Sequence, residues 1–197
     1  SVTGPAALTA ADVVVPGDPS SAAFPVCAAL LRPGSRLTVE NVSLSPARIG
    51  FVRTLERMGA DVAVRHEGQE GKEPRGAISV AYTDVLRGCE VPAQHIASLV
   101  DEVPVLSLVA ARARGVTVFK DVSELRVKET DRLAAIIDGL ALLGVDAWTA
   151  GDDLCIEGTP SLVVPEGLVF DSLGDHRLAM TWALVGLTGR VPVTVRD

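Results

Sequence analysis

One short segment occurs twice in this chain of 197 residues. LERMGADVAV covers residues 55–64 and LALLGVDAWT covers residues 140–149, so that Gly59 and Gly144 stand 85 residues apart. In both copies an apolar helical pattern runs into a glycine and a strand-like pattern follows, as expected where a helix ends and a strand begins. A repeat at this period indicates two copies of one supersecondary unit. The chain is therefore expected to fold from repeated units.

Hydrophobic periodicity and turn residues predict the same order of elements around both copies. The first copy has predicted strands over 12–16, 36–42, 61–64 and 77–81, helices over 22–31 and 45–58, and a polar connection at 66–75. The second copy has predicted strands over 89–95, 116–122, 145–149 and 154–157, and helices over 101–114 and 129–143. Each copy is thus expected to be a βαβαββ unit.

A third copy starts near the end of the sequence, with a strand over 168–170, a helix over 175–187 and a strand over 191–195. We expect one domain over 1–197, with units near 12–82, 88–158 and 168–197, the last incomplete. Parallel βαβ crossovers with hairpins give a layered α/β (α+β) fold. The pattern leaves open whether the helices face inward and the sheets outward, or the reverse. The half-built third unit leads us to expect a piece of a longer protein.

The charge balance limits the partners of the chain. The formal net charge is −7 and no basic stripe is present, which excludes a typical nucleic-acid surface. An anionic ligand must therefore be held by a few placed cations and not by the global field. No apolar segment reaches membrane-spanning length and no signal-peptide pattern opens the sequence, so we expect no membrane partner.

Cys27, Cys89 and Cys155 are far apart in the sequence, and each has apolar neighbours. No CxxC spacing and no Cys/His cluster is present. We interpret the three cysteines as small core residues in a reducing compartment and not as disulfides or metal ligands. The expected location is the cytoplasm, and no metal site is predicted.

The most charged segment of the chain is RVKETDR at 126–132. An apolar stripe with spacings of three and four residues follows, which predicts that the helix over 129–143 begins inside this segment. Arg126, Lys128 and Arg132 would then lie at the helix N-terminus, where the dipole disfavours cations by a few tenths of a kcal/mol each. Cations beside free backbone N–H groups form a place for an anion. A solvated charged turn explains the same pattern, and the pattern alone does not decide between the two.

Two other predicted helices also begin with charged residues. Asp101 opens the helix at 101–114, where a carboxylate is most often only a cap. Asp175, His176 and Arg177 open the helix at 175–187, and a histidine beside two charges is more often a surface feature than a catalyst.

Together the three helix starts support a stronger hypothesis. Because equivalent ends of packed repeats can converge on one side, we expect Lys128, Arg132 and Arg177 to form an anion clamp. Asp101 and Glu129 are then candidate proton-transfer groups. A phosphate or a carboxylate is the ligand that such arginine forks suit.

Other common motifs are absent from the sequence. GDPSS at 17–21 lacks the Gly-Lys-Ser/Thr ending of a P-loop, and no GxGxxG, HExxH or GxSxG is present. Dinucleotide-binding, zinc-protease and hydrolase functions therefore have no support from motifs.

Four segments resemble the EPSP synthase (3-phosphoshikimate 1-carboxyvinyltransferase) family: PGDPSSAAF at 16–24, DEVPVLSLVAA at 101–111, ELRVKETDRL at 124–133 and GDHRLAM at 174–180. They occur in family order, and the last two are highly specific. The resemblance implies transfer of the enolpyruvyl group of phosphoenolpyruvate to the 5-hydroxyl of shikimate 3-phosphate, with release of phosphate, in aromatic amino acid biosynthesis. It implies no metal or cofactor, and a fold of two similar domains, each of three βαβαββ units.

The resemblance also assigns roles to individual residues. Asp101 corresponds to a substrate ligand and general base near the attacking hydroxyl, and Glu129 to a catalytic acid/base group. Lys128 corresponds to a ligand of shikimate 3-phosphate, whereas Arg132 and Arg177 correspond to ligands of phosphoenolpyruvate.

Two further positions have a weaker case, and one partner is implied. His176 adjoins Arg177, and Glu124 stands where some members carry an asparagine that contacts shikimate. The family's N-terminal domain and a closing segment with a phosphoenolpyruvate-binding lysine have no counterpart here. We therefore expect this chain to match the second domain and not to turn over alone.

Two alternatives remain at this stage. UDP-N-acetylglucosamine enolpyruvyltransferase has the same fold, although KETDR and GDHRLAM favour EPSP synthase over it. A non-catalytic binding module that reuses these units is the second alternative.

Overall fold

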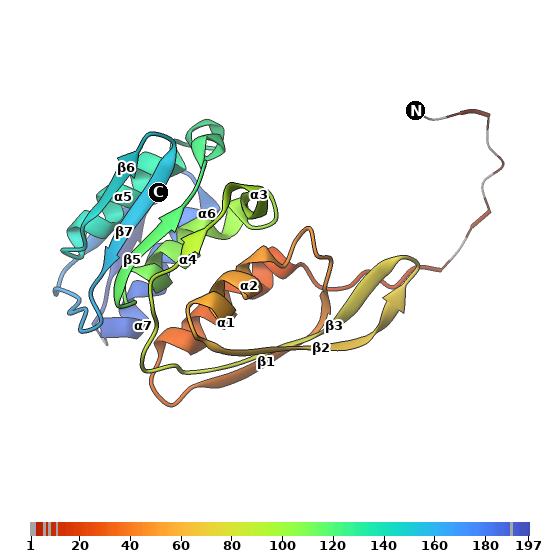
Figure 1. Cartoon of the computed structure of the whole chain (residues 1–197), viewed down its shortest axis with the longest axis horizontal. Helices are drawn as coiled ribbons and strands as arrows, with labels where there is room; N and C mark the ends of the chain where they lie inside the picture. Colours follow the sequence, from red (N-terminus) through yellow and green to blue (C-terminus); the bar gives the residue numbers. More distant parts are fainter. Residues whose placement is uncertain (1–2, 6, 8, 11, 190) are drawn as a thin grey trace.

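The computed structural model describes residues 3–5, 7, 9–10, 12–189 and 191–197 (Figure 1). Its first part contains α1 (Pro19–Leu31), β1 (Arg36–Ser43), α2 (Gly50–Arg57), β2 (Asp61–Glu70) and β3 (Glu73–Ala81). The three strands form an antiparallel sheet in the order β1-β3-β2. Gly17 adds a parallel bridge to Val42 of β1.

The second part repeats this order of elements, but additional short elements precede its first long helix. It contains β4 (Glu90–Val91), α3 (Ala93–Ile96), the 3-10 helix η1 (Val100–Glu102), α4 (Val103–Ala110), β5 (Gly115–Phe119), the 3-10 helix η2 (Ser123–Val127), α5 (Arg132–Leu142), β6 (Ala147–Ala150) and β7 (Asp153–Gly158). The sheet order is β4-β5-β7-β6, in which β4 and β5 are parallel and the other pairs antiparallel.

The last part contains β8 (Val169–Asp171), α6 (His176–Ala183), α7 (Val185–Gly189) and β9 (Thr194–Arg196). β8 and β9 pair in parallel, as β4 and β5 do in the second part. The mixture of helices and strands agrees with the predicted α+β class.

The helices form the inside of the molecule and the sheets lie outside (Figure 1). All eight residues of α4 are buried. This helix contacts α1, α5 and α6, while α1 packs on β1 and β3, and α5 packs against β6. The structure therefore answers the question that the sequence left open, because the apolar helix faces meet one another at the centre.

The repeated helix exit is the same structural joint in both copies. Gly59 has φ +79° and Gly144 has φ +69°, in the left-handed region that favours glycine. Beyond them, the Ala60 amide donates to the Leu55 carbonyl at 3.0 Å and the Val145 amide donates to the Leu140 carbonyl at 3.1 Å. Both are Schellman-type ends, in which the glycine turns the chain out of the helix and into the next strand.

Two predicted elements of the first part are wrong. The strand predicted over 12–16 does not form, and Val13 and Val15 are 69% and 79% exposed. The polar connection predicted over 66–75 instead continues the β2–β3 hairpin, with a register shift between His66 and Gly68. Backbone pairing across the hairpin holds this polar stretch extended, although no apolar alternation marks it.

Several helix boundaries also differ from the prediction. The helix predicted from residue 45 begins at Gly50, and the helix predicted over 101–114 is η1 followed by the shorter α4. The strand predicted over 89–95 is only β4, and α3 follows Pro92. The helix predicted from residue 129 begins at Arg132, because the Asp131 side chain accepts the Ala134 amide at 3.0 Å and caps α5.

A glycine inside α5 allows α6 to approach closely. A Cβ added to Gly139 would collide with Cζ2 of Trp182, whose ring stacks on Phe170 with centroids 5.0 Å apart. Trp182 is 1% exposed and stacked on Phe170, so a shift of its ring would disturb that packing.

We expect Gly139→Ala to lower the free energy of unfolding by about 1–2 kcal/mol, because overpacking outweighs the gain in helix propensity. Chemical denaturation of the variant and of Gly139→Ala/Trp182→Phe measures this effect. The smaller ring removes the atoms that the new methyl group meets, so the two substitutions should cost less together than separately. Equal stability of Gly139→Ala and the unaltered chain would contradict this packing argument.

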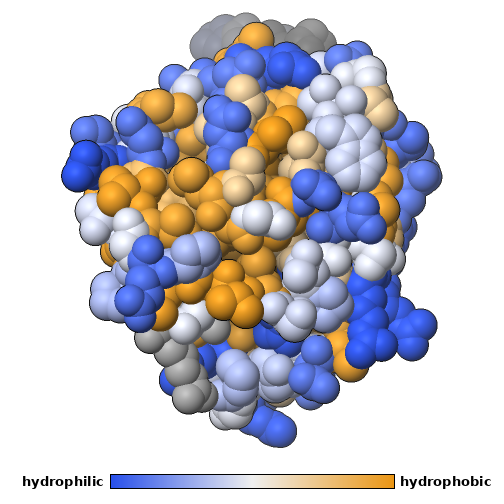
Figure 2. All heavy atoms as spheres, turned by 90° about the vertical axis from the view of Figure 1, so that its left-hand side faces the viewer, coloured by the Kyte–Doolittle hydropathy of each residue, from blue (hydrophilic) through white to orange (hydrophobic). Residues whose placement is uncertain are grey.

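One face of the molecule carries exposed apolar side chains (Figure 2). Leu142 of α5, Val169 of β8 and Leu173 line a cleft of about 260 Å³ that also includes Trp182. Among the described helices, none has the length and apolar character needed to cross a membrane.

Candidate functional site

The three charged segments predicted from the sequence meet around one carboxylate. Asp101 Oδ1 lies 3.7 Å from Lys128 Nζ and 3.2 Å from Arg132 Nη1, and its Oδ2 lies 3.3 Å from Arg177 Nη2. The three cations come from the segment before α5, from the first residue of α5 and from the first turn of α6. The convergence that the sequence predicted is therefore present.

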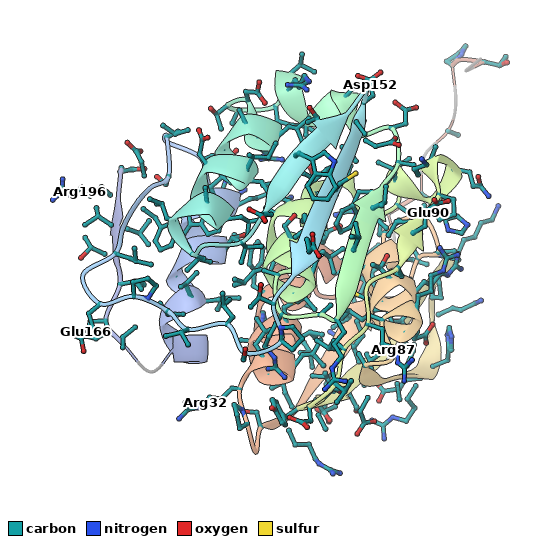
Figure 3. All side chains as sticks on the ribbon, turned by 60° about the vertical axis from the view of Figure 1, so that its left-hand side comes forward. Arg32, Arg87, Glu90, Asp152, Glu166 and Arg196 are labelled. Atoms are coloured by element: carbon teal, nitrogen blue, oxygen red, sulfur yellow. The ribbon has the colours of Figure 1, made fainter. Side chains whose placement is uncertain are left out.

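Arg132 is the buried centre of this cluster. Its side chain is 1% exposed, and its Nε donates to Asp175 Oδ2 at 2.7 Å. Nη1 donates to Asp101 and Nη2 to Glu129. In contrast, the charged side chains labelled in Figure 3 lie at the rim of the molecule. A guanidinium in the interior requires such a complete set of acceptors, because an unpaired buried charge is very costly.

Asp175 has two tasks at the start of α6. Its carboxylate accepts a hydrogen bond from the guanidinium of Arg132. It also caps the helix, because it accepts hydrogen bonds from the Arg177 amide at 2.8 Å and from the Leu178 amide at 3.3 Å. Burial by itself raises the pKa of Asp175. The hydrogen bond and charge of Arg132 and the hydrogen bonds from the two amides have the opposite effect and outweigh burial, so the pKa is lowered. Asp175 is therefore ionised at neutral pH and fixes Arg132 in place.

Arg177 lies at the edge of the cluster and is 15% exposed. Its Nη1 donates to the Asp101 carbonyl at 3.2 Å and to Glu102 Oε1 at 3.4 Å, and its Nη2 donates to Asp101 Oδ2. Both ends of the guanidinium thus hold acceptors from the segment that leads into α4.

Lys128 and the two glutamates lie toward solvent. Lys128 pairs with Glu124, and Glu129 pairs with Arg132. The side chains of Glu124 and Glu129 are 57% and 52% exposed, so they can move at low cost. Glu124 and Glu129 are thus the most exposed acids of the cluster, ahead of Asp101 at 36%.

The anion clamp differs from the predicted one in two respects. Lys128 and Glu129 precede α5, because they lie in a bend at 128–130 between η2 and the first residue of the helix. The first amides of α5 and α6 are also not free for an anion, since Asp131 and Asp175 cap them. The cations are therefore paired with carboxylates of the chain itself, and a ligand must compete with those carboxylates.

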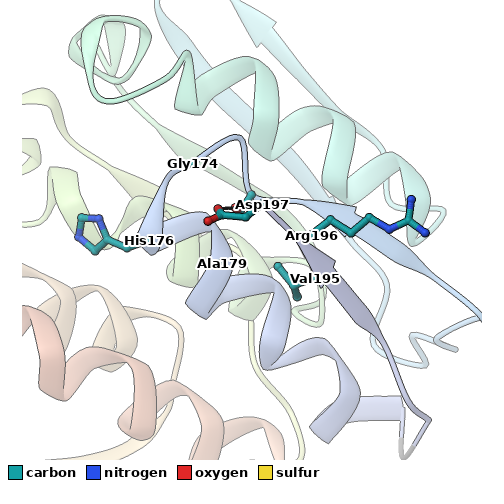
Figure 4. A pocket seen from close by; sticks show the side chains of 7 residues that line it. Gly174, His176, Ala179, Val195, Arg196 and Asp197 are labelled. Carbon is teal, nitrogen blue, oxygen red and sulfur yellow. Dashed lines mark hydrogen bonds between the residues drawn. The ribbon is translucent and has the colours of Figure 1, made fainter.

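His176 does not join the cluster. It is exposed, and its imidazole makes no hydrogen bond or ion pair with the described residues. It borders a cavity of about 430 Å³ that Gly174, Ala179 and Val195 also line. Figure 4 shows its ring pointing to the side opposite Arg196, away from the rest of the lining. The weaker case for His176 gains no support from this geometry.

The sequence placed Asp175 at a charged helix start without assigning it to the site. It gave no role to Glu102, Ser20 or Arg48. Asp175 and Glu102 are buried, and Ser20 of α1 and Arg48 line a small cavity with Asp101 and Glu102. The only local signal was the pair Asp101-Glu102 before a proline, in which two adjacent acids at a helix start exceed what one cap needs. Within the described residues, no group of three or more His, Cys, Asp or Glu is arranged to hold a metal ion.

Comparison with known proteins shows the family to which the chain belongs. The family model for EPSP synthase (3-phosphoshikimate 1-carboxyvinyltransferase) matches residues 1–197. The chain is 44% identical over 197 residues to the 3-phosphoshikimate 1-carboxyvinyltransferase of Gluconobacter oxydans, over 100% of this chain and 44% of the relative. The EPSP synthase of Acinetobacter baumannii has a TM-score of 0.87 at 36% identity, over 93% of this chain and 42% of that chain.

A more distant structure shares the fold alone. The enolpyruvyl transferase NikO from Streptomyces tendae has a TM-score of 0.68 at 21% identity. These likenesses confirm the predicted enolpyruvyl transferase fold. The chain spans less than half the length of the curated relatives it matches. With its whole length matched by the family model, the chain belongs to the EPSP synthase family.

Proposed function

We propose that this chain supplies one half of an active site for carboxyvinyl transfer. In the proposed reaction, phosphoenolpyruvate donates its enolpyruvyl group to the 5-hydroxyl of shikimate 3-phosphate and phosphate is released. The observation that carries the proposal is the meeting of Lys128, Arg132 and Arg177 around Asp101 in a chain of this family. Two substrates that each carry a phosphate and a carboxylate need fixed cations, and the transferred hydroxyl proton needs a carboxylate within reach.

The reaction proceeds by addition and elimination. The 5-hydroxyl oxygen attacks C2 of phosphoenolpyruvate and gives its proton to Asp101, while protonated Glu129 gives a proton to the C3 methylene. The methyl group of the resulting tetrahedral intermediate then returns a proton to the Glu129 carboxylate, and the C2–O bond to phosphate breaks. The bond electrons leave with the phosphate. Asp101 is 36% exposed, so it is open to a substrate hydroxyl.

The cations hold the anionic groups in this scheme. Lys128 binds the phosphate of shikimate 3-phosphate, whereas Arg132 and Arg177 bind phosphoenolpyruvate. Arg132 releases Glu129 or Asp101 when its ligand arrives, since both occupy its outer nitrogens in the structure. Glu124, which pairs with Lys128, is a lesser contributor at the shikimate side.

The site is completed by a second domain in this proposal. The relatives are more than twice as long as this chain, which supports a partner domain that carries the remaining substrate ligands. Residues 1–197 form one domain of units near 12–82, 88–158 and 168–197. The free thiols of Cys27, Cys89 and Cys155 support a reducing compartment, so we place the reaction in the cytoplasm.

Domain complementation tests the proposal. We expect this chain alone to release no phosphate from shikimate 3-phosphate and phosphoenolpyruvate, because it holds only part of the ligands. Mixing it with the N-terminal half of a relative such as the Gluconobacter oxydans enzyme is expected to restore phosphate release. A phosphate-coupled colorimetric assay measures the product.

Two outcomes would contradict the proposal. Turnover of the mixture with UDP-N-acetylglucosamine but not with shikimate 3-phosphate would assign the other enolpyruvyl transfer. A folded mixture that binds neither substrate would support the alternative that the chain is a non-catalytic binding module. The control is a mixture in which this chain carries Lys128→Ala and Arg132→Lys, which should stay inactive.

A further inference from the structure

Glu102 is a buried acid that the proposed chemistry does not use. It follows Asp101 in η1 and is 3% exposed. Burial raises the pKa of Glu102, and the Ser20 hydroxyl, Arg177 and Arg48 reduce this effect without cancelling it. An acid in this position is costly unless its partners are well placed, so its contacts indicate what it does.

One of these contacts decides which edge of Arg177 is available. A guanidinium has five N–H donors. Nη1 uses both of its donors on the Asp101 carbonyl and Glu102, and Nη2 uses one on the Asp101 carboxylate. Among the described residues no acceptor is recorded for the Nε–H, which lies on the same edge of the planar group as Nη2. This edge suits a carboxylate or a phosphate in a bidentate contact.

Glu102 is itself held from the first part of the chain. The Ser20 hydroxyl on α1 lines the same small cavity as Glu102 and lowers its pKa, and it accepts a hydrogen bond from Arg48 at 3.1 Å. Arg48 also pairs with Asp18, the cap of α1, at 3.1 Å. A cavity of about 30 Å³ lies between these groups, so they are close without being fully packed. The start of α1 is thus connected through Glu102 to the guanidinium on α6.

We propose that Glu102 is a positioning residue that holds Arg177 by Nη1 and keeps the Nε–Nη2 edge free for an anionic substrate. The inference rests on the proposed function, since it takes Arg177 as a ligand of phosphoenolpyruvate. Glu102 touches no substrate itself and acts through the orientation of the guanidinium.

The direction of the affinity change in one variant distinguishes a positioning role of Glu102 from a purely electrostatic one. Glu102→Gln removes a negative charge near an anion site, which strengthens anion binding if charge alone matters. If Glu102 positions Arg177, the same change weakens the binding of phosphoenolpyruvate by about tenfold. Titration calorimetry on the full chain measures this affinity. Glu157→Gln, an exposed acid on β7, is the matched control and should leave it unchanged.

A second measurement needs no ligand. Rotation of the Arg177 guanidinium is visible in ¹⁵N NMR spectra of the arginine side chains, with Arg177→Lys identifying the signal. Glu102→Gln is expected to make this rotation faster, and Ser20→Ala to change it in the same direction but less. Ser20→Ala also supplies the test if Glu102→Gln does not fold.

The outcomes are distinct for the two proposals. Unchanged or tighter binding in Glu102→Gln, or unchanged rotation of Arg177, overturns the role of Glu102. An unaltered chain that binds no phosphoenolpyruvate, alone or with its complementing half, counts against the proposed function. The rotation measurement still decides on Glu102 in that case.

Discussion

Replacement of Arg132 by methionine is expected to lower the free energy of unfolding by about 3–5 kcal/mol. The side chain of Arg132 is 1% exposed, and that of its partner Asp175 is 0% exposed. Without the guanidinium this carboxylate remains buried with no cation, which costs far more than a surface ion pair contributes. Denaturant unfolding followed by circular dichroism measures the difference.

A second substitution tests this explanation. Asparagine at 175 still caps the amides of α6 but carries no charge, so Arg132→Met/Asp175→Asn should be more stable than Arg132→Met alone. Lys128→Met removes a cation that is 21% exposed, and we expect a loss below about 1 kcal/mol. A loss equally small for Arg132→Met would show that the interior does not depend on this ion pair.

The same pair has a defined pH dependence. The pKa of Asp175 is lowered in the folded chain, so its contribution to stability is present above the ordinary carboxyl pKa of about 4. It is lost as the pH falls through the lower native value. The stability difference between the unaltered chain and Arg132→Met should therefore shrink in acid below about pH 4 and remain constant near neutrality.

Replacement of Asp101 by asparagine is expected to reduce phosphate release by the complemented enzyme by about 10²–10⁴-fold. The amide cannot accept the proton of the substrate hydroxyl. Substrate binding should not weaken in parallel, because Lys128, Arg132 and Arg177 lose a competing carboxylate. We therefore expect a fall in kcat with an unchanged or lower KM, which steady-state kinetics of phosphate release measures.

Asp153→Asn is the matched control for this prediction. Asp153 is also an ion-paired aspartate, with Lys120 at 2.7 Å, but it belongs to β7 and not to the cluster. Its replacement should leave turnover unchanged. A raised KM with normal kcat in Asp101→Asn would mean that Asp101 only binds substrate and does not move the proton.

The sequence predicted most of the features that depend on local chemistry. Gly59 and Gly144 marked the helix exits, because few residues other than glycine adopt the left-handed conformation found there. The charged starts near Asp101, Lys128 and Arg177 indicated the site, and the repeat gave a reason for them to meet. The roles of these residues stay predictions, as does the division of the chain into units.

Features that depend on packing between units escaped the sequence. Val13 and Val15 have strand-like composition, but no partner strand pairs with them in the described chain. Glu102 looks like a surface acid until α1 covers it. Two carboxylate partners of Arg132, Asp101 and Asp175, come from 31 and 43 residues away, and no local pattern reports such a distance.

The internal ion pairs around Arg132 have a consequence for selectivity. A cell contains abundant chloride and inorganic phosphate, and an open trio of cations would be occupied by them much of the time. In this structure a small anion gains little binding free energy, because binding to Arg132 would leave Asp101 or Glu129 without its ion-pair partner. A ligand that brings both an anion for the arginine and a hydrogen-bond donor for the displaced acid would compensate both sides. The salt bridges of the chain itself thus disfavour the binding of small inorganic anions at Arg132.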